Sequence, residues 1–320
     1  MDFLIGVFTM SIDKMILVSG IPRSGTTAVG DMLSLGRNVG SLYEPLNYHI
    51  GSSDIQKYFQ FPGQDGFSWE NIDKIVCDIR RLNLEFKKIG SPEDQGIKKI
   101  VKRLYGGRPR LTQQLCKVNP FLDTIVWKDP FASFFLGYLY RQHNINVVVT
   151  LRNPWAVAGS FKRMRWSFDL ERIYHGLETM GISFSLPYEF LSESEGDSVK
   201  NSVLLWYAIY SKTLQELKDK NRILLVDLDK LVKNPLQAYK NIYKGVGLPW
   251  TNNIEKKIVE TYSKSSSRPS EPRPGVTHDK RRDFTQVNTY YKKILTSDEV
   301  DFVTQVSGNL WYEILHYCND

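Results

Sequence analysis

The sequence predicts an α/β fold of three layers, with a central parallel sheet and helices on both of its faces. Short, continuously apolar segments alternate with segments of helical pattern through most of the 320 residues. Strands that are apolar on both sides are typical of a parallel sheet covered on both faces. The stretch SGIPRSGTT, which joins an apolar segment to a helical one, supports the same fold. We expect a single domain over residues 1–320.

Five segments are expected to form the sheet. The run INVVVTL at 145–151 is rich in β-branched residues and is ended by Asn-Pro, which indicates a strand. The other four expected strands are 15–20, 39–43, 124–128 and 222–228. A helix is expected from Thr26 to Leu35. Residues 50–112 are polar and rich in Lys, Gly and Pro, and we interpret them as a partly helical insertion between the second and third strands.

Composition narrows the range of functions. The net charge of +7, from 42 basic and 35 acidic residues, suits an anionic ligand. Because the charge is spread along the chain without an arginine-rich run, we expect no nucleic-acid partner. The three cysteines are odd in number and include no C-x-x-C, so neither a disulfide framework nor a zinc site is expected.

The N-terminal run MDFLIGVFTM is apolar but short. A helix that spans a bilayer needs about 20 apolar residues. The run also lacks a basic start and a small-residue cleavage site, so we predict neither a transmembrane segment nor a signal peptide. The expected location is the cytoplasm.

The turn after the first strand has the spacing of a phosphate-binding loop. Gly20 and Gly25 fit G-x-x-x-x-G, but Thr26 stands where a P-loop NTPase has its lysine. A strand that turns into a helix N-terminus directs backbone N–H groups and the helix dipole at an anion. Here Arg23 supplies the cation, and Thr26 and Thr27 supply hydroxyls. This pattern indicates a monophosphate site rather than a site for a metal-bound triphosphate.

The stretch GIPRSGTT resembles the 5′-phosphosulfate-binding loop of the sulfotransferases that use 3′-phosphoadenosine 5′-phosphosulfate (PAPS). The resemblance implies a P-loop NTPase-like fold, PAPS as co-substrate and no metal. It implies a further, catalytic role for Arg23 beside its role in binding. The residues that it assigns to cofactor binding in this loop are Pro22, Arg23, Ser24, Gly25, Thr26 and Thr27.

A second signature of the same family follows in VVVTLRNPWAVAGSF. In the family, an arginine that ends a strand and a serine eight residues later hold the 3′-phosphate of the nucleotide. Arg152 and Ser160 have this spacing. An arginine fork can grip a phosphate with two bonds, and the serine, about two helical turns on, donates from the same side.

Two charged residues end neighbouring strands and are the catalytic candidates. Glu44 follows the second strand, and a carboxylate beside an anion site makes sense as a general base. The EP sequence at this point is similar to that of carbohydrate sulfotransferases, which also implies a base; a loop carboxylate paired with an arginine is the alternative. Lys128 ends the third strand, where it either contacts the sulfonate or acceptor or pairs with Asp129 or Glu44.

Two further sets of residues are assigned more loosely. In the family, a late basic segment folds over the nucleotide, and the candidates here are Lys280, Arg281 and Arg282. The segment departs from the Arg-Lys-Gly motif of the cytosolic enzymes, so the contacting side chain stays open. Trp155 and Phe161 either stack on adenine or belong to the core, and we favour the core.

The predicted function is transfer of the sulfuryl group of PAPS to a hydroxyl by in-line displacement. A saccharide or glycoconjugate is the expected acceptor, held by residues 50–112, 168–200 and 262–288, in a bacterial enzyme. A P-loop kinase or NTPase is one alternative, and a non-catalytic protein that binds a nucleotide or carbohydrate is the other. The sequence leaves the acceptor's identity and the oligomeric state open.

Overall fold

The computed structural model describes residues 12–87, 107–182, 185–219, 222–263 and 286–318. Its strands pair in parallel in the order β2-β3-β1-β4-β5. They are β1 (Lys14–Ser19), β2 (Val39–Tyr43), β3 (Thr124–Lys128), β4 (Asn146–Leu151) and β5 (Ile223–Asp227). Each strand begins and ends within one residue of the range that the sequence predicts.

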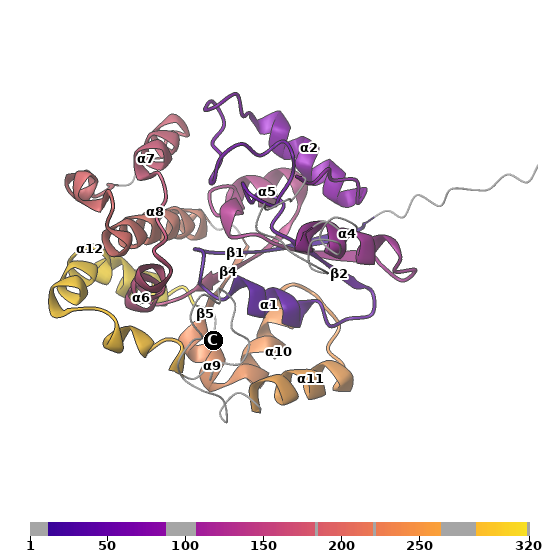
Figure 1. Cartoon of the computed structure of the whole chain (residues 1–320). Helices are drawn as coiled ribbons and strands as arrows, with labels where there is room; N and C mark the ends of the chain where they lie inside the picture. The colour runs from indigo at the N-terminus through magenta and orange to yellow at the C-terminus, as the bar shows by residue number, and fades with distance from the viewer. Residues whose placement is uncertain (1–11, 88–106, 183–184, 220–221, 264–285, 319–320) are drawn as a thin grey trace, which may run out of the picture.

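Helices cover both faces of this sheet (Figure 1). On one face lie α1 (Thr26–Leu33), α9 (Leu228–Lys233), α10 (Pro235–Gly245) and α11 (Asn252–Ser263). Around the other lie α2 (Trp69–Arg80), α4 (Arg108–Lys117), α5 (Leu136–His143), α6 (Pro154–Met164), α7 (Leu170–Thr179), α8 (Ser198–Lys218) and α12 (Ser297–Leu315). Short 3₁₀ turns complete the described elements: η1 (Pro130–Ala132), η2 (Tyr188–Phe190), η3 (Ser192–Ser194) and η5 (Tyr290–Lys293).

The central strand β1 explains why two layers of helices are needed. Successive side chains of a strand point to opposite faces of the sheet. Met15 and Leu17 belong to the hydrophobic cluster on the α8 side, whereas Ile16 and Val18 belong to the cluster on the α1 side. All four are almost fully buried. The fold is therefore the predicted three-layer, P-loop NTPase-like α/β architecture.

The segment interpreted as an insertion takes part in the main core. Its helix α2 buries Ile72, Ile75 and Ile79 in the same cluster as the strands. The segment is polar on average, so its mean composition does not reveal the apolar face of α2. The loop after β2 is tied to α7 by Arg172, which donates to the backbone carbonyls of residues 58 and 59.

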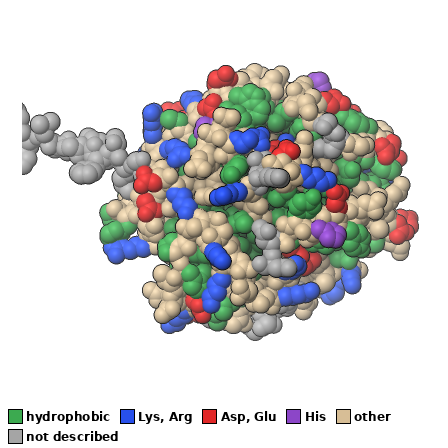
Figure 2. All heavy atoms as spheres, turned by 180° about the vertical axis from the view of Figure 1, so that it is seen from behind, with side chains coloured by type: hydrophobic (Ala, Val, Ile, Leu, Met, Phe, Trp, Pro, Cys, Tyr) green, Lys and Arg blue, Asp and Glu red, His purple; other side chains and the backbone are tan. Residues whose placement is uncertain are grey.

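The surface has a mixed character. Figure 2 shows basic, acidic and apolar side chains interspersed on one face of the molecule, without a single basic stripe. Among the helices that the structure describes, none has the length and apolar character needed to cross a bilayer.

Candidate functional site

The turn between β1 and α1 lies at the carboxyl end of the central strand. Gly20 and Gly25 have φ of 135° and 86°, and a Cβ on Gly20 would lie 2.5 Å from the Thr150 carbonyl oxygen. Arg23 also has positive φ, at 77°, a conformation that costs a non-glycine residue about 1–3 kcal/mol. Helix α1 then begins at Thr26. The turn and first helical residues comprise Pro22, Arg23, Ser24, Gly25, Thr26 and Thr27.

The hydroxyls of this loop point in different directions. Ser24 is fully buried, and its Oγ lies 2.7 Å from Thr150 Oγ1 on β4. This side chain therefore fixes the turn to the neighbouring strand. Thr26 is also buried, whereas Thr27 is partly exposed and contacts the hydroxyl of Tyr43 on β2.

Three residues from the two predicted phosphate motifs meet in space. The Arg23 guanidinium donates from Nε to Ser160 Oγ at 3.1 Å, and Arg152 donates from Nη1 to the Arg23 carbonyl at 2.8 Å. Arg152 is only 5% exposed. Its Nη2 donates to the Val287 carbonyl at 2.7 Å and its Nε to Asn288 Oδ1 at 2.8 Å. Sequence reasoning missed Asn288, because nothing in its local sequence marks it.

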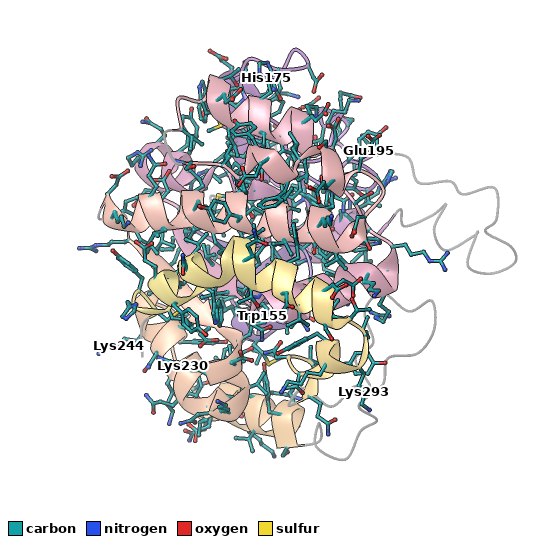
Figure 3. All side chains as sticks on the ribbon, turned by 90° about the vertical axis from the view of Figure 1, so that its left-hand side faces the viewer. Trp155, His175, Glu195, Lys230, Lys244 and Lys293 are labelled. Carbon is teal, nitrogen blue, oxygen red and sulfur yellow. The ribbon has the colours of Figure 1, made fainter. Side chains whose placement is uncertain are left out.

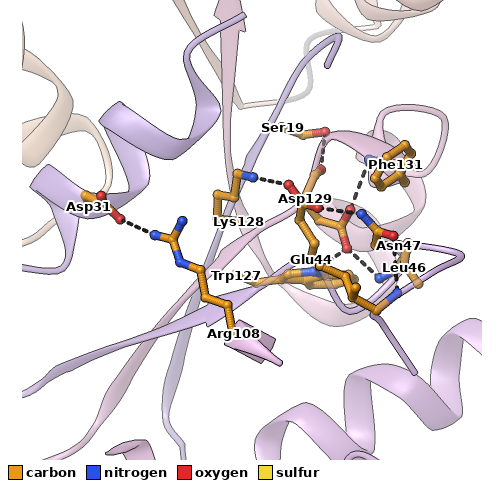
Figure 4. Close-up of polar contacts among 11 residues, drawn as sticks. Ser19, Asp31, Glu44, Leu46, Asn47, Arg108, Trp127, Lys128, Asp129 and Phe131 are labelled. Carbon is orange, nitrogen blue, oxygen red and sulfur yellow. Dashed lines mark hydrogen bonds and ion pairs between the residues drawn. The ribbon is translucent and has the colours of Figure 1, made fainter. Parts of the chain in front are cut away.

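Glu44 and Lys128 form a buried ion pair at the ends of β2 and β3 (Figure 4). Glu44 Oε1 accepts from Lys128 Nζ, and Oε2 accepts from Asn47 Nδ2 at 2.6 Å. The backbone N–H of Glu44, a residue with φ of 48°, donates to the Lys128 carbonyl at 2.8 Å. Burial lowers the pKa of Lys128, and the charge of Glu44 acts in the opposite direction. Of the partners that the sequence left open for Lys128, the structure selects Glu44.

Asp129 is a second, fully buried carboxylate beside this pair. Its Oδ2 accepts from the Leu46 N–H at 2.6 Å and from Trp127 Nε1 at 3.2 Å, and its Oδ1 accepts from the Phe131 N–H at 3.0 Å. Burial, followed by the charge of Glu44, raises the pKa of Asp129 to about 7. From the sequence, Asp129 is expected only as a possible partner of Lys128. In the structure, its carboxylate accepts a hydrogen bond from Leu46, in the turn that follows Glu44.

Tyr43 connects the turn between β1 and α1 to Glu44. Its hydroxyl contacts Thr27 of α1 and the Glu44 carboxylate, and burial raises its pKa, as does the charge of Glu44. Lys128 Nζ and the Arg108 guanidinium lie 4.1 and 4.0 Å from the centre of its ring. Such cation–π contacts favour a fixed ring position. The sequence gave no signal for this role, because Tyr43 fits an ordinary strand residue.

Other predicted site residues lie elsewhere. Lys280 and Arg281 fall outside the residues that the structure describes. Phe161 is fully buried in the core, as favoured from the sequence. Trp155 is partly exposed on the face seen in Figure 3 and donates from Nε1 to Thr304 Oγ1 at 3.1 Å. It borders a pocket of about 390 Å³ that is also lined by Asn153, Asp229, Asn288 and Tyr291.

The geometry offers two adjoining functions. The first comes from a helix N-terminus, the loop backbone and two arginines, which are groups that attract an anion. The second is a carboxylate that lies next to it, with a lysine and a tyrosine in contact. Among the residues described, no group of three or more His, Cys, Asp or Glu side chains is arranged to hold a metal.

Comparison with known proteins gives the following matches. The model of the "Sulfotransferase family" matches residues 15–252. No curated protein matches the chain. Similar solved structures include the sulfotransferase domain from the curacin biosynthetic pathway (14% identity, TM-score 0.44, 93% of this chain and 98% of that chain). Mouse sulfotransferase SULT7A1 complexed with PAP has 14% identity and a TM-score of 0.44, over 93% and 85% of the two chains. Sulfotransferase STF9 from Mycobacterium avium has 13% identity and a TM-score of 0.45, over 93% and 76%.

Proposed function

The chain belongs to the sulfotransferase family, and from this premise we propose that it transfers the sulfuryl group of PAPS to a saccharide hydroxyl. Glu44 acts as the general base, and the displacement is in-line and independent of metal. The observation that carries the proposal is the meeting of the Gly20–Thr27 turn with Arg152 and Ser160, because hydrogen bonds join two motifs that lie more than a hundred residues apart.

The nucleotide is proposed to bind across this anion site. Its 5′-phosphosulfate lies at the N-terminus of α1, where the loop N–H groups, Arg23, Thr26 and Thr27 neutralise and position it. Its 3′-phosphate lies at Arg152 and Ser160. Arg23 also stabilises the charge that develops on the leaving 5′-phosphate. Lys280 and Arg281 are proposed to complete the nucleotide contacts.

Glu44 is proposed to remove the acceptor proton. As the acceptor oxygen forms its bond to sulfur, the bond between sulfur and the phosphate oxygen breaks, and the hydroxyl proton passes to the Glu44 carboxylate. The leaving group is 3′,5′-ADP (PAP). Lys128, whose ammonium contacts Glu44, is proposed to stabilise the sulfonate oxygens during transfer. Most of the catalysis is positioning and charge stabilisation, which require no metal.

A saccharide acceptor is supported by the aromatic side chains next to Glu44. Burial raises the pKa of Tyr58 to about 12, and the nearby charge of Glu44 contributes. The ring of Tyr58 lies 5.7 Å from that of Tyr48 and 4.7 Å from that of Phe131. Tyrosine combines an apolar face with a polar hydroxyl, which suits a sugar ring with its C–H faces and hydroxyl groups.

A single domain is part of the same proposal. The helix α2 of the segment between β2 and β3 packs into the hydrophobic cluster of the sheet, and this segment borders Glu44. The acceptor site is therefore formed by the same domain as the anion site.

A ligand-dependent thermal shift tests the nucleotide assignment. We expect PAP to raise the melting temperature equally with and without EDTA, because Thr26 stands where the loop of an NTPase has its lysine. A shift produced by ATP and Mg²⁺ but not by PAP would favour a kinase or NTPase instead.

Transfer of radiolabelled sulfate from PAPS to oligosaccharides, phenols and peptides then tests the acceptor. Transfer to phenols or peptides alone would exclude the saccharide proposal, and no transfer with intact PAP binding would favour a non-catalytic protein.

A further inference from the structure

Asp229, in the first turn of α9, anchors two asparagines by both of its carboxylate oxygens. Its Oδ1 accepts from Asn288 Nδ2 at 2.5 Å, and its Oδ2 accepts from Asn153 Nδ2 at 3.2 Å. Asn153 also caps α6, because its Oδ1 accepts from the Ala156 N–H at 2.8 Å. The carboxylate therefore joins α9, the start of α6 and the segment before η5.

The carboxylate of Asp229 also decides which way the Asn288 amide faces. An ionised carboxylate only accepts hydrogen bonds, so the amide must present its NH₂ group to it. The Oδ1 of Asn288 is then directed to the opposite side, where Arg152 donates to it from Nε at 2.8 Å. Asn288 is 6% exposed, so solvent offers its amide little competition.

Asn288 in turn fixes the fork of Arg152. The guanidinium is planar, and its donors keep a rigid relative geometry. With Nε held by Asn288, Nη1 meets the Arg23 carbonyl at 2.8 Å and Nη2 meets the Val287 carbonyl at 2.7 Å. Arg23 has φ of 77°, so the bond to its carbonyl also supports the strained residue of the anion loop. A chain of polar contacts thus runs from α9 to the loop.

We infer that Asn288 and Asp229 are positioning residues for the nucleotide. They hold the Arg152 guanidinium in the orientation that receives the 3′-phosphate, and they keep the Arg23 carbonyl in place, without touching the nucleotide themselves. The inference rests on the proposed function, because it assumes that Arg152 binds the phosphate. A purely structural role, in which Asn288 only attaches the 286–293 segment to the domain, is the competing explanation.

A double-mutant cycle on PAP affinity separates the two roles. We expect Asn288→Ala to raise the dissociation constant for PAP about tenfold, the effect of losing one charge-assisted hydrogen bond. Arg152→Ala should raise it about a hundredfold or more. If Asn288 acts through Arg152, adding Asn288→Ala to the Arg152→Ala protein changes the constant less than twofold. In steady-state transfer, Asn288→Ala should raise the KM for PAPS while kcat at saturation changes less than threefold.

A second, conservative variant tests the same role, and a matched control variant shows the effect of a substitution elsewhere on the same segment. Asp229→Asn keeps the size of the side chain but places an amide opposite two amides, so it should weaken PAP binding several-fold in the same Arg152-dependent way. Thr289→Ala is the matched control on the same segment, since its Oγ1 bonds only to the Gln286 carbonyl in the contacts described. It should bind PAP like the wild type. Circular dichroism and thermal unfolding of each variant check that the fold is kept.

The outcomes distinguish the inference from the function on which it rests. If Arg152→Ala leaves PAP affinity unchanged, the proposed nucleotide site is wrong. If Arg152→Ala weakens binding but Asn288→Ala and Asp229→Asn do not, the site stands and the positioning role is wrong. An equal effect of Asn288→Ala in both backgrounds, or a loss of kcat without a change in KM, also overturns the positioning role.

Discussion

In the proposed site, the half around Arg23 and Arg152 is held by hydrogen bonds to backbone carbonyls and hydroxyls, whereas the half around Glu44 is held by buried charges. Arg152 bonds to two carbonyls, and Arg23 bonds to Ser160. Glu44 instead contacts the ammonium of Lys128 inside the protein. The loss of a single hydrogen bond lowers the stability of the folded protein modestly. The removal of the partner of a buried charge lowers it much more. The two halves should therefore respond differently to single substitutions.

The largest expected effect is on catalysis, at Glu44. Glu44→Gln keeps the shape of the side chain but removes the proton acceptor, so we expect transfer to fall about 10²- to 10⁴-fold. PAP affinity should change little, because the anion loop is intact. Rates with radiolabelled PAPS and calorimetric PAP binding measure both effects, with Glu313→Gln, an exposed carboxylate on α12, as control. A wild-type rate in Glu44→Gln would show that another group is the base.

The next effect is on stability, at Lys128. Lys128→Met keeps an apolar chain of similar length but leaves the Glu44 carboxylate buried without its cation. We expect the free energy of unfolding to fall by about 3–5 kcal/mol, measured by urea denaturation. Combining it with Glu44→Gln should restore most of the loss, because no uncompensated charge remains. A loss below about 1 kcal/mol in the single variant would contradict the importance of the ion pair.

The anion loop should depend on backbone conformation instead. In Gly20→Ala, the new Cβ would meet the Thr150 carbonyl at 2.5 Å, at a φ of +135°. We expect a loss of about 2–3 kcal/mol of stability and weaker PAP binding. Gly63→Ala is the matched control, because Gly63 also has positive φ, +90°, but no atom within 4 Å of a Cβ. It should cost about 1 kcal/mol. Equal losses in the two variants would indicate that crowding at Gly20 is unimportant.

A pH-dependent effect is expected from Asp129. Its pKa is raised by burial to about 7, above the ordinary value of about 4. Between these values the folded protein binds more protons than the unfolded chain, so this group makes stability fall as pH rises from about 4 to about 7 and has no further effect above. The slope is at most about 1.4 kcal/mol per pH unit.

Unfolding of the wild type and of Asp129→Asn at several pH values measures this effect. The variant lacks the titration, so the stability of the wild type relative to the variant should decrease from pH 5 to pH 8. A relative stability that stays constant or increases with pH would show that Asp129 is ionised throughout the range.

The smallest effect is expected at Ser160. Ser160→Ala removes one hydrogen bond to Arg23, of 3.1 Å and partly exposed. Such a bond contributes about 0.5–1.5 kcal/mol, so the dissociation constant for PAP should rise about two- to tenfold. Calorimetry detects the change, and Thr261→Ala serves as the control, because its hydroxyl donates one hydrogen bond to the Lys257 carbonyl on α11. A hundredfold loss would mean that Ser160 contributes more than one such bond, and an unchanged dissociation constant would mean that its hydroxyl does not contribute to nucleotide binding.

The sequence by itself determined the sheet and the glycine turn between β1 and α1. The five strands are continuous apolar runs, and such a run needs cover on both faces whatever its neighbours are. The glycine spacing of the loop and the interval from Arg152 to Ser160 are also local, because a turn and a helix fix the distances between nearby residues. These features were therefore predictable, and the structure brings the two motifs together.

Only the tertiary structure decided which groups meet across the chain. Lys128 had two carboxylates as possible partners, and the side-by-side ends of β2 and β3 select Glu44. Asn288 bonds to Arg152, and Asp229 bonds to Asn288, from segments far along the chain, so no spacing rule could identify them. The tertiary structure also decides which groups are buried. Asp129 is an ordinary carboxylate in the sequence, and its pKa is raised because the folded chain removes it from water.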